Sequence, residues 1–170
     1  IKGQEQKSFD ALAKAIKNHN CAGFIFEPLV QGAAGMVMYE PESLDKLIQI
    51  CLENKVLTIA DEVMTGFGKT GKTFACDYLT EQPDMMCLSK ALTGGTIPMA
   101  ITTFTQDIFE AFYDEDINKA LFHGHTFTAN PTGCAAALAS LSLLETSAMQ
   151  HNLIRINKSH LDFKKRVENH

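Results

Sequence analysis

The stretch VLTIADEV, Val56–Val63, decides the fold, because an apolar run with a β-branched residue ends there in an acidic pair. Short apolar runs of this kind are typical of buried strands. Similar runs occur in CAGFIFEP at 21–28 and in DMMCLSK at 84–90, and PMAITTF at 98–104 has β-branched character. The sequence therefore predicts four strands.

Helical patterns separate these strands. Apolar residues at positions 9, 12, 13 and 16 predict a first helix that ends near residues 18–20. The small residues of LVQGAAGMVMY, 29–39, predict a loop, after which Ser43 can cap a second helix. TQDIFEAFYD, 105–114, predicts a third helix with Thr105 as its cap.

The C-terminal part is expected to be helical. ALFHGHTFTANP, 120–131, has no regular period, but a small-residue helix is predicted from about Pro131 to Met149 and a more polar helix from about Leu153. Alternation of strands and helices predicts an α/β fold with a mostly parallel sheet flanked by helices. Ligands of such sheets gather beyond the carboxyl ends of the strands.

Three ionisable residues directly follow predicted strands: Glu27, Asp61 and Lys90. Apolar or small residues precede each of them, so we expect all three to be largely desolvated and to need partners. One interpretation is a buried Asp–Lys ion pair that closes the sheet. The other is a cofactor that offers a cationic ring nitrogen to the carboxylate and a carbonyl carbon to the lysine, as pyridoxal phosphate does.

Both residue types suit that cofactor. A lysine amine among apolar neighbours loses its proton more easily and can form a Schiff base with an aldehyde. Asp61 would keep the pyridine nitrogen protonated, which makes the ring an electron sink. Lys90, once displaced by a substrate amine, would carry the Cα proton of the substrate as base and then as acid.

GFGKTGKT, Gly66–Thr73, fits the phosphate-loop pattern at every position. A phosphate loop needs a following helix, but Pro83 limits any helix after Thr73 to about two turns, and no helical apolar stripe develops. The hydrophobic run that ends in Asp-Glu also leads into this loop, so it cannot serve as the separate magnesium-binding strand. We favour a glycine-rich turn here and keep a nucleotide-binding module as an alternative.

The composition is that of a globular chain, with 170 residues, 45% hydrophobic content and a net charge of −5. Scattered basic residues disfavour nucleic acid and membranes as partners. No apolar run reaches the ~20 residues of a membrane span and no signal-peptide profile is present, so we expect a cytoplasmic protein. The five cysteines form no C-x-x-C pair, which favours reduced thiols over disulfides or a metal site.

Three motifs, IADEVMTGFGKTG, LSKALTGG and HGHTFTANPTGCAAALASLSLLE, resemble those of the class III pyridoxal-phosphate aminotransferases. The resemblance runs from about Cys21 to Glu145. It implies the core of the large domain of the fold-type-I pyridoxal-phosphate-dependent transferase fold, in a homodimer with shared active sites.

Two further segments, EPLVQGAAGMVMYEPESLDKLIQIC and ALTGGTIPMAITTFT, look like a narrower group within this class. Its members transfer the amino group of S-adenosylmethionine to 8-amino-7-oxononanoate and give 7,8-diaminononanoate in biotin biosynthesis. The alternative is another class III ω-aminotransferase that acts on ornithine, γ-aminobutyrate or a diamine.

The resemblance also implies roles for single residues. Lys90 matches the Schiff-base lysine, Asp61 the partner of the pyridine nitrogen, and Val63 the aliphatic residue packed on the ring; on spacing alone, Val63 could equally be an ordinary core residue. Glu27 matches a strand-end glutamate with a structural or substrate-gating role.

The HGHTF motif implies a shared site, in which Thr126 and His125 reach the cofactor phosphate of the neighbouring subunit and Gly124 borders the substrate. Spacing alone would favour ordinary hydrogen-bonded loop histidines. Many relatives of the narrower group have proline where this chain has His125, and the ornithine and γ-aminobutyrate enzymes typically have glutamine where Met64 stands.

Class members also have a Ser-Gly phosphate loop, an aromatic residue that stacks on the ring, and a small domain with a carboxylate-binding arginine, none of which this sequence contains. We therefore expect residues 1–150 to form the central part of the pyridoxal-phosphate-binding large domain, and residues 151–170 a helix leading toward a C-terminal small domain. As a fragment, the chain is expected to bind the cofactor weakly or not at all. An inert structural fragment is thus a further interpretation.

Overall fold

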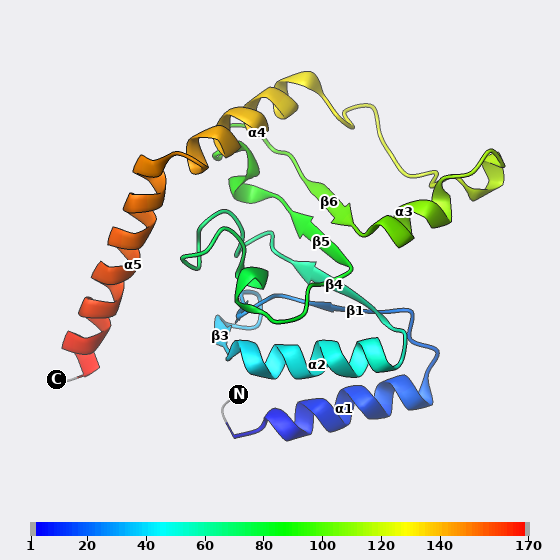
Figure 1. Cartoon of the computed structure of the whole chain (residues 1–170), viewed down its shortest axis with the longest axis horizontal. Coiled ribbons are helices and arrows are strands. Elements are labelled where there is room, and N and C mark those ends of the chain that lie inside the picture. The colour runs from blue at the N-terminus through cyan, green and yellow to red at the C-terminus, as the bar shows by residue number, and fades with distance from the viewer. Residues whose placement is uncertain (1–2, 169–170) are drawn as a thin grey trace.

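A four-stranded sheet with the order β1-β4-β5-β6 forms the centre of the computed structural model, which describes residues 3–168 (Figure 1). β1, β4 and β5 run parallel, and β6 is antiparallel to β5. The predicted α/β class with a mostly parallel sheet is confirmed. The strands of this sheet are β1 (Gly23–Phe26), β4 (Leu57–Asp61), β5 (Met85–Leu88) and β6 (Ile101–Phe104).

Helices connect the strands, and Figure 1 shows α1 and α2 side by side below β1, with α4 at the opposite end of the sheet and α5 running from α4 back toward the level of α1 and α2. The α-helices are α1 (Glu5–Asn18), α2 (Pro41–Glu53), α3 (Gln106–Phe112), α4 (Pro131–Leu144) and α5 (Ser147–Glu168). Short 3₁₀ helices occur at η1 (Ala75–Tyr78), η2 (Lys90–Thr93) and η3 (Ile117–Lys119). Among the described residues, no helix is both long and apolar enough to cross a membrane.

The core lies between α2 and one face of the sheet. Leu44 and Ile48 of α2 are buried against Phe26 of β1 and Ala60 of β4, and Cys76 of η1 completes the cluster. Because strand side chains alternate between faces, burying this face of the sheet leaves every second residue on the opposite one. The hydrophobic effect of this cluster therefore fixes which side of the sheet Asp61 occupies.

The opposite face of the sheet carries a row of apolar side chains. Ile25 pairs in register with Ile59, Ile59 with Met85, and Met85 with Phe104. Ile25 and Phe104 are exposed, and the two central residues are half-buried. The residue at the carboxyl end of β4 on this same face is Asp61.

A buried polar pair sets the start of β5 against β4. Thr58 donates its N–H to Asp84 Oδ2 over 2.7 Å and its hydroxyl to the same oxygen over 2.8 Å. In the other direction, the backbone N–H of Asp84 donates to Thr58 Oγ1 over 3.0 Å. Since these bonds join the beginning of one strand to the interior of the other, they also fix which residues meet at the carboxyl ends, where Asp61 pairs with Cys87.

The structure differs from the sequence-based expectation between residues 29 and 40. The predicted loop contains a short antiparallel hairpin of β2 (Val30–Gln31) and β3 (Val37–Met38). α2 begins at Pro41, with Glu40 at the N-cap position, so Ser43 lies in the first turn and is not the cap. Proline is favoured at the first helical position because its missing N–H would be unpaired there anyway.

The C-terminal helices also divide differently. α4 begins at Pro131 as predicted, and the Asn130 side chain caps it by accepting the N–H of Gly133 over 2.7 Å. It ends at Leu144, however, and α5 already begins at Ser147. Thr146 explains the break, because its hydroxyl donates to the Leu143 carbonyl and competes with the helical hydrogen bonds.

Candidate active site

Glu27, Asp61 and Lys90 lie at the same edge of the sheet. Asp61 is the last residue of β4 and pairs with Cys87, three residues before Lys90. Glu27 follows β1, whose last residue, Phe26, pairs with Ala60. The carboxyl ends of three parallel strands thus bring the residues together, as the topology predicted.

The expected burial of these residues is wrong for Lys90. Lys90 is exposed, and Asp61 and Glu27 are half-buried. No ion pair joins Asp61 to Lys90, so the interpretation in which these two residues merely close the sheet is not supported. The apolar residues before Lys90 belong to β5, but the chain leaves the sheet at Ser89 and carries the lysine out of the core.

Asp61 is oriented by its own loop. Its Oδ1 accepts the backbone N–H of Val63 over 3.0 Å. No other group within residues 3–168 donates a hydrogen bond to this carboxylate, so Oδ2 is available to an external donor. Val63 is half-buried immediately beyond the strand. The arrangement can present a negative charge to a cationic group placed over this edge.

Lys90 has an unusual backbone conformation, with φ of 26°. A residue with a Cβ seldom occupies this region, and such conformations cost about 1–3 kcal/mol and cluster at functional sites. No carboxylate among the described residues pairs with its ammonium group. The strained turn therefore presents an unpaired amine at the sheet edge.

Side-chain hydrogen bonds hold the turn that follows Lys90. Ser89 donates to the Met99 carbonyl over 2.8 Å, and Thr93 donates to the Ile97 carbonyl over 2.6 Å. Behind the turn, α4 packs against η2. These contacts hold the strained residue between two fixed segments, which is what a rigid presentation of the amine requires.

Glu27 is engaged with the β2–β3 hairpin. Its Oε2 accepts the N–H of Gly32 over 2.6 Å, and the Tyr39 hydroxyl donates to its backbone carbonyl. A Cβ on Gly32 would lie 2.8 Å from Met64 Sδ, so the hairpin approaches the loop after β4 closely at this point. Glu27 thus ties the hairpin to the sheet edge.

Glu62 is the acidic residue that sequence reasoning passed over. Its side chain is fully buried, Oε1 accepts the N–H of Cys76 over 2.7 Å, and Oε2 accepts the Thr65 hydroxyl over 2.5 Å. The sequence signal was present, because alternation places the residue after Asp61 on the core face.

The glycine-rich turn at 66–73 serves the packing of α5. A Cβ on Gly68 would lie 3.0 Å from Leu153, and one on Gly71 would lie 3.5 Å from Asn157, both residues of α5. Both glycines have positive φ. Lys72 donates to the Asp77 carbonyl over 2.6 Å, so the lysine of the pattern is directed back onto the turn.

Gly124, His125 and Thr126 lie in the segment between η3 and α4, which Figure 1 shows projecting from the sheet. All three are exposed. His125 Nδ1 accepts the N–H of Phe127 over 3.1 Å, and its own N–H binds Thr128 Oγ1 over 3.0 Å. None of the three shares a hydrogen bond with Asp61, Lys90 or Glu27.

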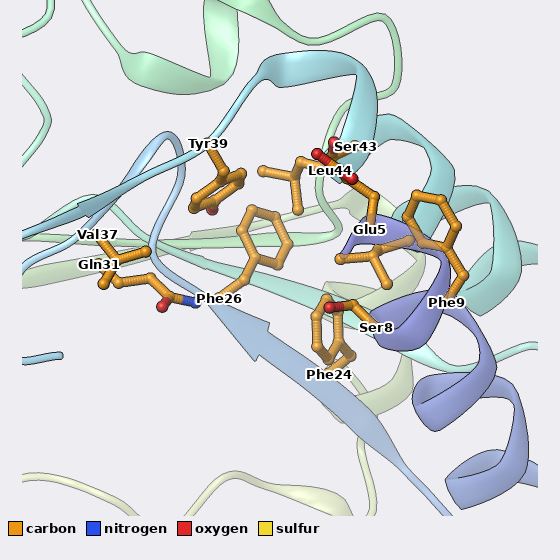
Figure 2. Close-up of a pocket in the computed structure, with 11 residues that line it drawn as sticks. Glu5, Ser8, Phe9, Phe24, Phe26, Gln31, Val37, Tyr39, Ser43 and Leu44 are labelled. Atoms are coloured by element: carbon orange, nitrogen blue, oxygen red, sulfur yellow. The ribbon is translucent and has the colours of Figure 1, made fainter. Parts of the chain in front are cut away.

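A hollow of about 280 Å³ lies between α1, α2 and the β2–β3 hairpin (Figure 2). Phe24, Phe26 and Tyr39 line it, and burial raises the pKa of Tyr39. It includes none of the three strand-end residues, so it is not the candidate site. Within the part of the chain that the structure describes, no group of three or more metal-ligating side chains comes together, and the five cysteines are free.

Comparison with known proteins agrees with this geometry. The family model of aminotransferase class-III matches residues 2–168. The chain belongs to the class III aminotransferases. Its fold is that of pyridoxal-phosphate aminotransferases, as the resemblance of the motifs implied.

Aminotransferases with established names are similar over most of the chain. The adenosylmethionine-8-amino-7-oxononanoate aminotransferase of Synechococcus elongatus is 47% identical over 144 residues, which are 85% of this chain and 34% of that protein. The crystal structure of the enzyme of the same name from Methanocaldococcus jannaschii is 40% identical, with a TM-score of 0.76 over 85% of this chain and 34% of its own.

A likeness to a solved transaminase structure covers more of the chain. The structure of a transaminase from the marine bacterium Virgibacillus is 30% identical and superposes with a TM-score of 0.87 over 97% of this chain and 38% of its own. The chain thus spans about a third of the length of the relatives it matches.

Proposed function

We propose that this chain carries the lysine-bearing part of a pyridoxal-phosphate-dependent aminotransferase that transfers the amino group of S-adenosylmethionine to 8-amino-7-oxononanoate. The observation that carries the proposal is the placement of Asp61 and Lys90 at the ends of two adjacent parallel strands, each without an ionic partner among residues 3–168. The named relatives, which are 38–47% identical, support the choice of substrates.

The residues present fit the cofactor. Asp61 has one oxygen fixed by Val63, and its other oxygen accepts no hydrogen bond from the described residues, which suits a single N–H donor on a ring. Lys90 offers an amine that no carboxylate in the described part of the chain neutralises, on a backbone held in a strained conformation. Val63, which directly follows this edge, would pack against the ring.

Pyridoxal phosphate, when bound, supplies an electrophilic carbon for amino groups and a ring that withdraws electrons. The residues of this chain supply the rest. Asp61 would hold a proton on the ring nitrogen, because a carboxylate stabilises the cationic form of a base beside it. Lys90 would hold the cofactor covalently, and once a substrate amine displaces it, its free amine would take a proton from the substrate Cα and return one.

The exposed segment around Thr126 fits a role in a neighbouring subunit. Gly124, His125 and Thr126 make local contacts only, so they are accessible to a second copy. In this proposal the protein is a homodimer. Thr126 and His125 reach the cofactor phosphate of the neighbouring subunit. Gly124 and Glu27 border the substrate. Residues 1–150 are then the central part of the large domain, and residues 151–170 lead toward a small domain.

The test uses the intact protein, incubated with pyridoxal phosphate and then with borohydride. Peptide mass spectrometry should find the pyridoxyl group on Lys90, and Lys90→Ala should remove it. Labelling of Lys72 or Lys69 in place of Lys90 would overturn the assignment.

The substrates need a separate assay. 8-Amino-7-oxononanoate should be converted with S-adenosylmethionine as the amino donor, whereas ornithine, γ-aminobutyrate and simple diamines should serve poorly. Activity confined to a diamine or to γ-aminobutyrate would keep the cofactor assignment and reject the proposed substrates.

A further inference from the structure

Glu62 directly follows Asp61 and is a buried carboxylate that has no role in the proposed chemistry. It is completely shielded from solvent, and no lysine, arginine or histidine among the described residues forms an ion pair with it. A carboxylate in such a place is costly unless donors satisfy it. Its two donors are the Cys76 N–H and the Thr65 hydroxyl.

These two donors belong to different parts of the chain. Thr65 lies in the turn that leaves β4, and Cys76 lies in η1, beyond the glycine-rich segment. The Glu62 backbone makes two further bonds, donating its N–H to the Cys87 carbonyl of β5 over 3.0 Å and accepting the Gly66 N–H over 3.0 Å. One residue thus ties together β5, the turn and η1.

The consequence reaches Asp61 through one peptide group. The Val63 N–H that orients Asp61 Oδ1 belongs to the peptide that joins Glu62 to Val63. The direction of this N–H depends on the backbone dihedrals of Glu62. Both carboxylate oxygens of Glu62 accept hydrogen bonds, and its backbone N–H and carbonyl are also bonded. The backbone dihedrals of Glu62 therefore have little freedom.

We propose that Glu62 is a positioning residue, whose buried carboxylate fixes the peptide that aims Asp61 at the ring nitrogen of the cofactor. The role of Asp61 rests on the proposed function, but the effect of Glu62 on the Val63 N–H does not. Neighbouring residues of a strand point to opposite faces of the sheet. Asp61 can therefore face the cofactor while Glu62 is bonded within the core.

The test compares three variants of the intact protein. Glu62→Gln keeps the shape and an acceptor for the Cys76 N–H, and its amide group can donate to the Thr65 oxygen. Glu62→Leu keeps a similar volume without any acceptor. Glu53→Leu is the matched control, because Glu53 is an exposed glutamate at the end of α2.

The first readout needs no cofactor. Hydrogen exchange of the Val63 amide should be faster in Glu62→Leu by roughly 10-fold or more, and Glu62→Gln should restore most of the protection. Equal Val63 protection in Glu62→Leu and the control variant would overturn the proposal, whatever the protein binds.

The second readout concerns the bound cofactor. Glu62→Leu should weaken pyridoxal phosphate binding roughly 10- to 100-fold, a loss typical of residues that orient the groups in direct contact with a bound ligand. It should also shift the pH midpoint of the cofactor's absorption band in the same direction as Asp61→Asn. In an Asp61→Asn background, Glu62→Leu should cause no further shift.

The outcomes separate the two proposals. Faster Val63 exchange in a protein that does not bind pyridoxal phosphate would leave the positioning of Asp61 standing and reject the proposed function. A lower melting temperature in Glu62→Leu, with unchanged affinity and an unchanged absorption midpoint, would mean that Glu62 is only structural and would overturn its positioning role.

Discussion

Val63 donates its backbone N–H to the side chain of Asp61, only two residues before it in the chain. A bond of this Asx-turn type depends on local backbone geometry and not on a distant partner. Asp61 therefore keeps its orientation while Oδ2 is left available, and the sheet needs only to deliver the end of β4 to the right edge.

Asp61→Asn should abolish most activity while preserving the fold. The amide oxygen of asparagine can still accept the Val63 N–H, so the loop keeps its shape, but the negative charge is lost. We expect kcat/KM of the intact protein to fall about 10²-fold or more, since charge placed at a reacting group is among the largest catalytic terms. Asp107→Asn on exposed α3 is the control, and an equal loss in both variants would point to a nonspecific effect.

Gly32→Ala should disturb the contact between the hairpin and the loop after β4. The new methyl group would lie 2.8 Å from Met64 Sδ, so the methionine must move. Because this side chain is flexible, we expect a loss of about 1–2 kcal/mol in the free energy of unfolding. Met64→Ala should reduce the stability loss caused by Gly32→Ala. A double-mutant cycle of denaturant unfolding measures the coupling energy between positions 32 and 64. Additive losses would show that the two residues do not press on each other.

Cys51 should make stability depend on alkaline pH. Burial, with the nearby charge of Asp84, raises the pKa of the Cys51 thiol from 9.0 to about 11. The folded state therefore disfavours the thiolate, and its stabilisation is complete below pH 9 and is lost as pH rises from 9 through 11. Urea unfolding across this range should show the decline.

Alkylation checks the same shift directly. At pH 8 about one Cys51 in a thousand would be thiolate, against about one in eleven for a thiol with a pKa of 9.0. Iodoacetamide should therefore modify Cys51 much more slowly than half-buried Cys134. Equal rates would show that Cys51 is not shielded in solution.

Lys72→Ala should have little effect on ligand binding. Lys72 Nζ donates to the Asp77 carbonyl and lies 4.4 Å from the centre of the Tyr78 ring. Its ammonium group is therefore engaged by residues of the adjoining η1. We expect a stability loss of up to about 1 kcal/mol and no change in cofactor affinity. Lys69→Ala serves as the control. If the protein bound ATP saturably and the Lys72→Ala variant did not, the result would support the nucleotide-binding alternative.

Helical periodicity and short apolar runs predicted the first two helices and the strands of the sheet. The apolar spacing of α1 and α2 and the four sheet strands all correspond to helices and strands in the structure. The β2–β3 hairpin was missed because two-residue strands are too short to show alternation. The break at Thr146 was missed because a single hydroxyl that bonds to the preceding turn leaves the apolar pattern of the helix unchanged.

The candidate site was predictable in position but not in exposure. The strand-end rule brought Glu27, Asp61 and Lys90 to one edge, since it depends only on topology. The exposure of Lys90 depends on where the chain turns away from β5, and no periodic signal marks that turn. Glu62 was missed because its importance comes from Cys76, fourteen residues away, which joins it only after folding.

The contact between α5 and the glycine-rich turn has a mechanical consequence. α5 has 22 residues and approaches the turn through Leu153 at Gly68 and Asn157 at Gly71. With a rise of about 1.5 Å per residue, the part of the helix from Asn157 to Glu168 is roughly 16 Å long. A tilt of about 10° about this contact would move the C-terminal end of the helix by about 3 Å while the turn moves only slightly.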